Sequence, residues 1–429
     1  MTRPSAGTPM RLGFPGILLG LGLLIHMLVL AGPIWDEAKA LDQGQDFASY
    51  YYAVGAAARG LDPYDRRQLG TLAKEDGTRK SVFPFLYPPP FLLTMTWSLS
   101  MSLQSAYLTW FWLNGLFLLA ALLALWRWLP EPATMAAIGI VLATFTPIYD
   151  NQLMGQANLP VLGAMLWGLY LVERRHPVTG GALMGLACMM KMSPALMVAW
   201  WMYRRKWTAV LSASAAAALL SLAALPLVGW DAQLRFYRDV LPGFARGDYN
   251  GLFISILHPG NYSLPNLWAQ LFDAERRLTG LAQILATVTN LGLLGLLGWK
   301  LRRQAPDLLG AAAAAAAVSV MMVLIPVYAY EHHLVQLIFP LLVTSVAFAR
   351  GRLGRGWILT LAPAYTVLAW WWPAIAAASR SVGGPSGWLL QEAKLFAMVI
   401  VCLACAFAAT QQDRATSEPR LPDDHGERP

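Results

Sequence analysis

The sequence is poor in charge and cysteine and carries no nucleotide-binding fingerprint. Only 13% of its 429 residues are charged and 57% are hydrophobic, a balance that argues against a soluble globular domain of this length. The three cysteines all lie in apolar runs and fit small core residues better than a disulfide or metal site: Cys188, Cys402 and Cys405. No glycine-rich fingerprint follows a strand-like stretch, which disfavours a soluble nucleotide-binding enzyme.

Long hydrophobic runs fill most of the chain instead. The first, residues 12–32, follows a short basic tail, residues 1–11, and has about the ~20 residues that span a bilayer. No convincing signal-peptidase site follows it, so we interpret it as a retained anchor. The net charge of +8 comes from short Lys and Arg clusters between the runs. This positive-inside pattern argues against a nucleic-acid partner.

The flanking charges predict a fold and a topology. We expect an all-α polytopic membrane protein with about 10 to 12 transmembrane helices in a single domain over residues 12–410. Two long external segments, about residues 33–103 and 230–280, are expected to carry amphipathic helices on the outer face. Residues 411–429 are polar and charged and predict a disordered cytoplasmic tail.

One run does not fit a simple span. Residues 180–203 are bounded at both ends by basic clusters and contain Lys191 and Pro194 in the middle. A hairpin of two short helices, with Lys191 near its tip, accounts for both facts. The alternative is one continuous span with a proline kink, whose lysine snorkels to an interface.

Polar side chains gather at the external ends of the predicted spans. Asp46 follows the first span directly and is our candidate general base, with Tyr50 and Tyr51 beside it. The tyrosines alone could equally form an interfacial aromatic belt. Amides and hydroxyls suited to a polyol ligand occur in two further loops: Asn151, Gln152, Gln156, Asn158, Asn261 and Ser263.

A Glu-His-His triplet and Lys191 complete the candidate site. The ammonium of Lys191 suits an anionic phosphate. His332 and His333 are neighbours and cannot both face one ion from the same helix, which disfavours metal ligation. We expect one of them to bind a phosphate or a sugar hydroxyl, next to Glu331; the alternative is that both are satisfied at an interface.

These motifs together carry a family resemblance. They are Asp46-Phe-x-x-Tyr-Tyr, Gly60-x-x-Pro-Tyr-Asp65, Tyr87-Pro-Pro, Gly155-Gln-Ala-Asn-Leu159, Gly185-Leu-Ala leading to Lys191, Asn261-x-Ser-Leu264 and Glu331-His-His-Leu334. In this order, over residues 12–410, the chain resembles glycosyltransferase family 87, which has the GT-C membrane fold. That family includes mannosyltransferases that use polyprenyl-phosphate mannose.

The resemblance implies an enzyme of the cell envelope. Asp46 would deprotonate an acceptor hydroxyl as it attacks the anomeric carbon, with inversion, and Lys191, His332 and His333 would bind the donor phosphate. The implied partners are a polyprenyl-phosphate sugar, a glycolipid or glycan acceptor, and membrane lipids. No cofactor is implied; a divalent cation is not implied either, and the sequence leaves open whether one assists. The implied location is the inner or plasma membrane, with the active site on the external, periplasmic face.

Two other classes stay open at this stage. A transporter or lipid flippase would also be polytopic, but no clear internal repeat relates the two halves, and the polar residues gather on one face. A scaffold subunit without catalysis is disfavoured because Asp46 is present.

Overall fold

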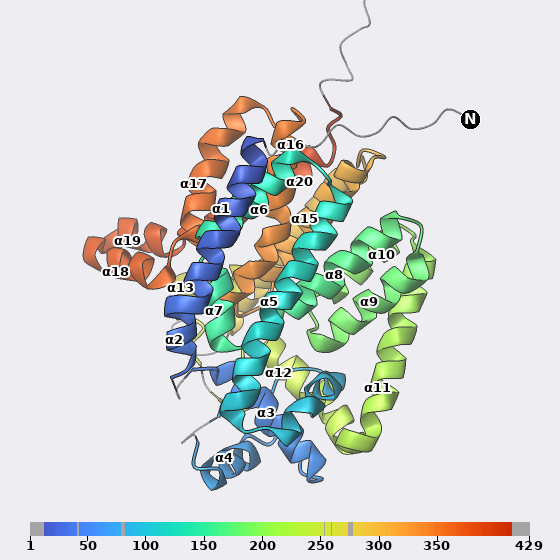
Figure 1. The fold of residues 1–429 in the computed structure, drawn as a ribbon, viewed down its shortest axis with the longest axis vertical. Coiled ribbons are helices and arrows are strands. Elements are labelled where there is room, and N and C mark those ends of the chain that lie inside the picture. Colours follow the sequence, from blue (N-terminus) through green and yellow to red (C-terminus); the bar gives the residue numbers. More distant parts are fainter. Residues whose placement is uncertain are drawn as a thin grey trace, which may run out of the picture.

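The computed structural model describes residues 13–40, 43–78, 82–252, 254–258, 260–272 and 278–413. The N-terminal tail and residues 414–429 of the predicted C-terminal tail lie outside these ranges. The described part is built from helices (Figure 1) and contains no strand, only an isolated bridge between Tyr249 and Leu252. The predicted all-α class is therefore confirmed.

Several helices are long and apolar enough to cross a membrane. Within the described residues there are five: Phe14–Ala38, Leu103–Trp128, Trp207–Ala245, Gly280–Leu301 and Glu331–Ala349. Three bent helix pairs raise the number to as many as eight. Other apolar runs form the shorter helices α8 (Asn158–Glu173), α9 (Pro177–Met190) and α15 (Leu308–Leu324). The chain is therefore a multi-pass membrane protein.

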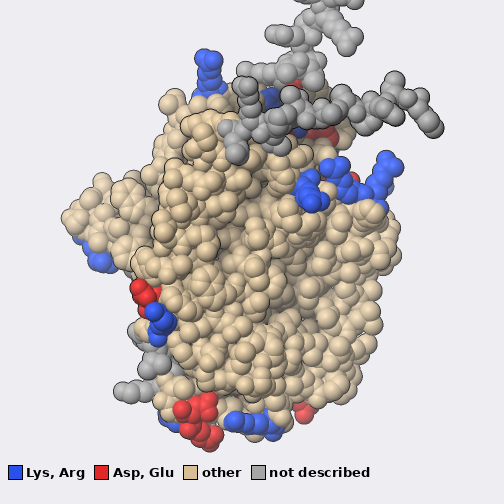
Figure 2. Space-filling model, viewed as in Figure 1, with Lys and Arg blue, Asp and Glu red and all other residues tan. Residues whose placement is uncertain are grey.

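The distribution of charge fits this conclusion. Most Lys, Arg, Asp and Glu side chains on the face drawn in Figure 2 lie toward the two ends of the molecule. Between them lies a broad band almost free of charge, as lipid contact requires.

The centre of the bundle is α15. Every side chain from Leu309 to Leu324 is buried, including an unbroken run of alanines, Ala311–Ala317. Small side chains let helix backbones approach closely where lipid gives no hydrophobic drive. Against α15 pack α10 (Ala195–Tyr203), α16 (Ile338–Ala349) and α20 (Ala393–Ala408).

The predicted hairpin is present as α9 and α10. The two helices are joined at Lys191–Pro194, and an ion pair between Lys206 and Glu173 brings the outer ends of the hairpin together. The α9 helix packs closely on α11 (Trp207–Arg235). A Cβ atom on Gly185 would lie 2.4 Å from the Ala213 carbonyl oxygen. This tight crossing fixes where the hairpin places Lys191.

A layer of shorter helices covers the lower end of the bundle in Figure 1. It contains α3 (Gln45–Ala58), α4 (Arg66–Glu75) and η2, a 3₁₀ helix over Pro89–Ser100. The side chain of Asp65 caps α4 by accepting a hydrogen bond from the Arg67 backbone N–H at 2.9 Å. The apolar segment after Tyr87 forms this 3₁₀ helix, which is separate from α5 (Leu103–Trp128) and precedes it in the chain.

The other helices complete the bundle and its margins. They are α1 (Phe14–Val29), η1 (Leu30–Ile34), α2 (Trp35–Ala38), α6 (Pro132–Thr144), α7 (Pro147–Met154), η3 (Phe236–Val240), α12 (Leu241–Ala245), α13 (Leu264–Phe272), α14 (Gly280–Leu301), η4 (Glu331–Leu337), η5 (Arg355–Trp357), α17 (Ile358–Ala369), α18 (Trp372–Val382) and α19 (Gly384–Gln391). In Figure 1, α18 and α19 project sideways from the bundle.

Candidate active site

A cavity of about 740 Å³ lies where the covering helices meet the bundle. Its polar end is formed by residues from four separate parts of the chain: Asp46, Gln156, Asn158, Lys191, His332 and His333. All six were predicted site residues, and the fold brings them to one wall of one cavity. Outside this polar end, the lining includes Met322 and Val323 of α15, apolar residues of α12 and one face of α14.

Two glycines fix the position of Asp46. Gly44 precedes α3 with a φ of 68° and donates its N–H to the Leu153 carbonyl at 2.9 Å. Gly155 also has a φ of 68°, and a Cβ there would lie 2.6 Å from the Cβ of Phe47. Both positions need the left-handed backbone that glycine adopts without strain. The first turn of α3 is thereby pressed against the turn between α7 and α8.

This contact places Asp46 beside Gln156. The Asp46 carboxylate accepts a hydrogen bond from the Gln156 side chain. Burial raises the pKa of Asp46, while electrostatic interactions with His332 and Lys191 and the Gln156 hydrogen bond oppose that rise. A carboxyl with a raised pKa is a stronger base when ionised, which suits proton abstraction from a hydroxyl.

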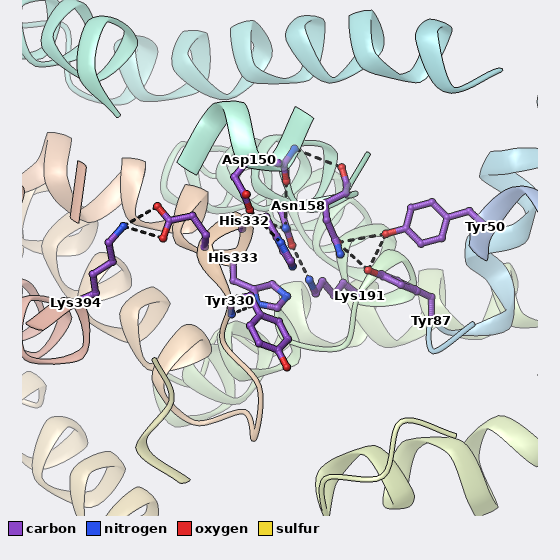
Figure 3. Close-up of polar contacts among 12 residues, drawn as sticks. Tyr50, Tyr87, Asp150, Asn158, Lys191, Tyr330, His332, His333 and Lys394 are labelled. Atoms are coloured by element: carbon purple, nitrogen blue, oxygen red, sulfur yellow. Dashed lines mark hydrogen bonds and ion pairs between the residues drawn. The ribbon is translucent and has the colours of Figure 1, made fainter. Parts of the chain in front are cut away.

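Two tyrosine hydroxyls hold the amide of Gln156 (Figure 3). Tyr87 donates to Gln156 Oε1 at 2.8 Å, and Tyr50 lies 3.3 Å from the same oxygen and 2.8 Å from the Tyr87 hydroxyl. With Oε1 occupied as an acceptor, the amide nitrogen is oriented to donate toward Asp46. Tyr50 is fully buried behind the cavity wall, so its role in the structure is to position Gln156.

Lys191 is held at the centre of the site by Asn158. Its ammonium lies 2.6 Å from Asn158 Oδ1 and 5.9 Å from the ring centroid of Tyr87. Asn158 in turn donates to Asn151 Oδ1 at 3.1 Å and to the His332 carbonyl at 2.9 Å. Asn151 therefore lies behind the wall and supports Asn158. Figure 3 shows Asn158 and Lys191 joined by a hydrogen bond, and Lys394 with its carboxylate partner as a separate pair.

The two histidines lie in different environments. Nδ1 of His332 lies 3.3 Å from Asp150 Oδ2, so this imidazole has a carboxylate partner. Nδ1 of His333 accepts a hydrogen bond from the Tyr330 backbone N–H at 2.9 Å, which leaves its Nε2 as the atom available to a ligand. Both side chains line the cavity.

Four other predicted site residues lie elsewhere. Glu331 is buried and faces Lys394 at 2.6 Å instead of the cavity. Asn261 and Ser263 are buried and hydrogen-bond the Val327 carbonyl at 2.9 and 2.8 Å, so they anchor the cavity-lining segment 327–330. Tyr51 donates to the Met101 carbonyl at 2.8 Å on the surface.

Three parts of the candidate site were not predicted from the sequence. Tyr87 appeared only within a motif, and Asp150 was not proposed as a site residue. One face of α14 also lines the cavity with Gln283, Thr287 and Asn290. Their spacing of four and three residues on an apolar helix was the available signal.

The arrangement can bind an anion and activate a hydroxyl. Lys191 and two imidazoles lie on the cavity wall that also carries Asp46, so a phosphate and a nucleophile could meet there. Within the described ranges, no group of three or more His, Cys, Asp and Glu side chains could hold a metal ion.

Comparison with known proteins identifies a family. The model of glycosyltransferase family 87 matches residues 85–326, more than half of the chain. The matched range includes Tyr87, Gln156 and Lys191, whereas Asp46 and the two histidines lie outside it. No curated protein and no solved structure gives a significant match.

Proposed function

The chain belongs to glycosyltransferase family 87 and is a membrane glycosyltransferase, and from this premise we propose its reaction. It transfers a sugar, with mannose as the first candidate, from a polyprenyl-phosphate donor to a glycolipid or glycan acceptor at the external face of the membrane. The convergence of Asp46, Lys191 and His333 on one cavity at the edge of the bundle is the observation that supports this most.

Each group has a role in the proposed step. The Asp46 carboxylate takes the proton from the acceptor hydroxyl, whose oxygen forms a bond to the anomeric carbon from the side opposite the phosphate. The bond between that carbon and the phosphate oxygen breaks, and polyprenyl phosphate leaves with the electron pair. Lys191 and the histidines stabilise the charge on the leaving phosphate. Attack from the opposite side inverts the anomeric centre.

The two ends of the cavity suggest where the substrates bind. Lys191 is the only Lys or Arg among the described cavity-lining residues, so we place the donor phosphate beside it. The polar face of α14 carries only amides and a hydroxyl, and Asn290 Oδ1 is enclosed without a hydrogen-bond partner. Neutral groups of this kind suit acceptor hydroxyls, and we place the acceptor along this face.

The test is transfer of radiolabelled mannose from synthetic polyprenyl-phosphate mannose to a membrane lipid extract. We expect transfer by the wild type and a loss of about 10²- to 10⁴-fold in kcat for Asp46→Asn, the usual contribution of a general base. The matched control is Asp36→Asn, because Asp36 is an exposed carboxylate that pairs with Lys39 at the surface.

The result that contradicts the proposal is equally clear. If no donor in a panel of polyprenyl-phosphate sugars supports transfer by the wild type, the donor class is wrong. If Asp46→Asn and Asp36→Asn retain the same activity, the base is wrong even where the donor is right.

A further inference from the structure

The most completely enclosed charge pair described in the molecule lies directly behind the two histidines. The Lys394 ammonium is 2.6 and 2.7 Å from the two carboxylate oxygens of Glu331. It also donates to the carbonyls of Trp370 at 2.7 Å and Leu368 at 3.3 Å. Both charged side chains are almost completely buried.

The pair connects the end of one helix with the start of another. The Leu368 and Trp370 carbonyls lie where α17 gives way to α18, a break with a bend of 104°. Carbonyls at such an end lack intrahelical partners, and Lys394, from α20, supplies them with a donor. The same ammonium holds Glu331, the first residue of η4.

The next two residues of η4 are the histidines that line the cavity. Figure 3 shows Lys394 and its partner carboxylate on the side of His332 and His333 away from Lys191. His332 is held from another direction by Asp150 of α7. The start of η4 is thus fixed at two points, Glu331 to α20 and His332 to α7.

Stability alone is a weak reason for such a pair. Removing two charges from water is costly, and replacing a buried ion pair by apolar residues of similar size is often neutral or stabilising. What apolar residues cannot supply is direction, because the ammonium here has four oriented acceptors and the carboxylate is gripped through both oxygens.

We propose that Lys394 and Glu331 form a positioning pair that orients His332 and His333 toward the donor phosphate. Neither residue touches the substrate. The inference rests on the proposed function, since it assigns a purpose to the same cavity. It also changes the role expected of Glu331 from ligand binding to support.

The experiment replaces both charges at once. In the double variant Glu331→Met/Lys394→Met we expect a melting temperature within about 3 °C of the wild type. We expect kcat/KM for the polyprenyl-phosphate sugar to fall about 100-fold, as for a reacting group displaced by about 1 Å, with little change in the acceptor KM. The matched control is Glu173→Met/Lys206→Met, which removes the pair that joins the ends of the α9–α10 hairpin.

A second readout does not depend on turnover. Polyprenyl phosphate, the proposed product, should raise the melting temperature of the wild type and of the control, and this shift should be lost in the Glu331→Met/Lys394→Met protein. A purely structural pair predicts the opposite result, a lower melting temperature with kcat/KM and the ligand shift intact, and that result would overturn the proposal.

A more conservative variant keeps the proposal testable if the double variant does not fold. Lys394→Arg keeps the charge but replaces a compact ammonium by a planar fork, and we expect about a 10-fold loss of kcat/KM; unchanged kcat/KM would refute positioning. The proposed function fails separately, when the wild type neither transfers the sugar nor gains stability from polyprenyl phosphate. If the wild type transfers the sugar and the variants keep the same kcat/KM and the same ligand shift, the proposed function stands and only the positioning role of the pair is contradicted.

Discussion

At the scale of single residues, the burial of Asp46 has two effects. It raises the pKa of the carboxyl, which suits a base, and it makes the ionised carboxylate costly for the stability of the fold. Its environment makes the carboxyl harder to ionise, and burial is the largest cause. On our proposal Asp46 acts as a base, and a base must be ionised to act. The folded enzyme would then carry a charge that the surrounding protein disfavours, a compromise often found at active sites.

The sign of this effect gives a prediction. Because folding raises the pKa of Asp46, the wild type loses stability as the pH rises through the folded value. Asp46→Asn removes that loss, so we expect the variant to melt roughly 1 to 3 °C higher at pH 7. The difference should disappear below the ordinary carboxyl pKa of 3.8. Calorimetry across pH checks this, and Asp36→Asn should show no such trend.

Residue identity alone could not reveal what Glu331 does. Successive residues of a 3₁₀ helix point about 120° apart, so Glu331 and His332 face different surroundings although they are neighbours. The partner of Glu331 is Lys394, 63 residues further along the chain. The histidines were predictable because their chemistry matched the other polar groups; the direction of the glutamate depended on a distant helix.

At the scale of secondary-structure elements, α14 has two distinct faces. Its buried side chains are few, namely Ala282, Ala286, Leu297 and Leu301. Next to this packing face lie the three polar side chains that line the cavity. Their spacing could be read from the sequence, but which face of the helix meets a cavity could not, because that depends on how α14 docks against α13 and α15.

A pair of threonines tests the acceptor role of this face. Thr287 and Thr366 are both exposed, and each hydroxyl donates to the carbonyl four residues earlier, at 2.8 and 3.0 Å. Only Thr287 lines the cavity. We expect Thr287→Val to raise the acceptor KM about 5-fold, the value of one hydrogen bond, and Thr366→Val to leave it unchanged. Equal acceptor KM values for the two variants would contradict the proposal that the acceptor binds along α14.

At the scale of the whole molecule, the charged side chains on the face drawn in Figure 2 lie mostly toward the two ends of the bundle. The sequence pattern assigned every basic cluster to one side and Asp46 to the other. Figure 2 shows Lys and Arg side chains toward both ends of the molecule, with a broad band almost free of charge between them, so the assignment of sides stays a prediction. The fold class and the hairpin at Lys191 could be predicted because lipid imposes simple rules on hydrophobic length and charge. The bends within spans could not, since they depend on packing.

Sidedness can be measured by cysteine labelling. The three native cysteines are buried, so a membrane-impermeant maleimide should give little background. We expect Glu75→Cys, on α4, to be labelled in intact cells, and Arg303→Cys, in the turn after α14, to be labelled only after the membrane is opened. Both positions are exposed in the structure. The reverse pattern would place the cavity on the cytoplasmic side.

The spread of the site along the chain also bears on how the enzyme is made. Its cavity needs Asp46 near the start, the histidines after residue 331 and, on our proposal, Lys394 near the end. At about 5 to 20 residues per second, a ribosome needs roughly 20 to 70 s to pass from the first of these to the last. Throughout that interval the nascent chain holds an incomplete site, so the enzyme cannot begin to consume its donor before nearly all of its helices have been synthesised.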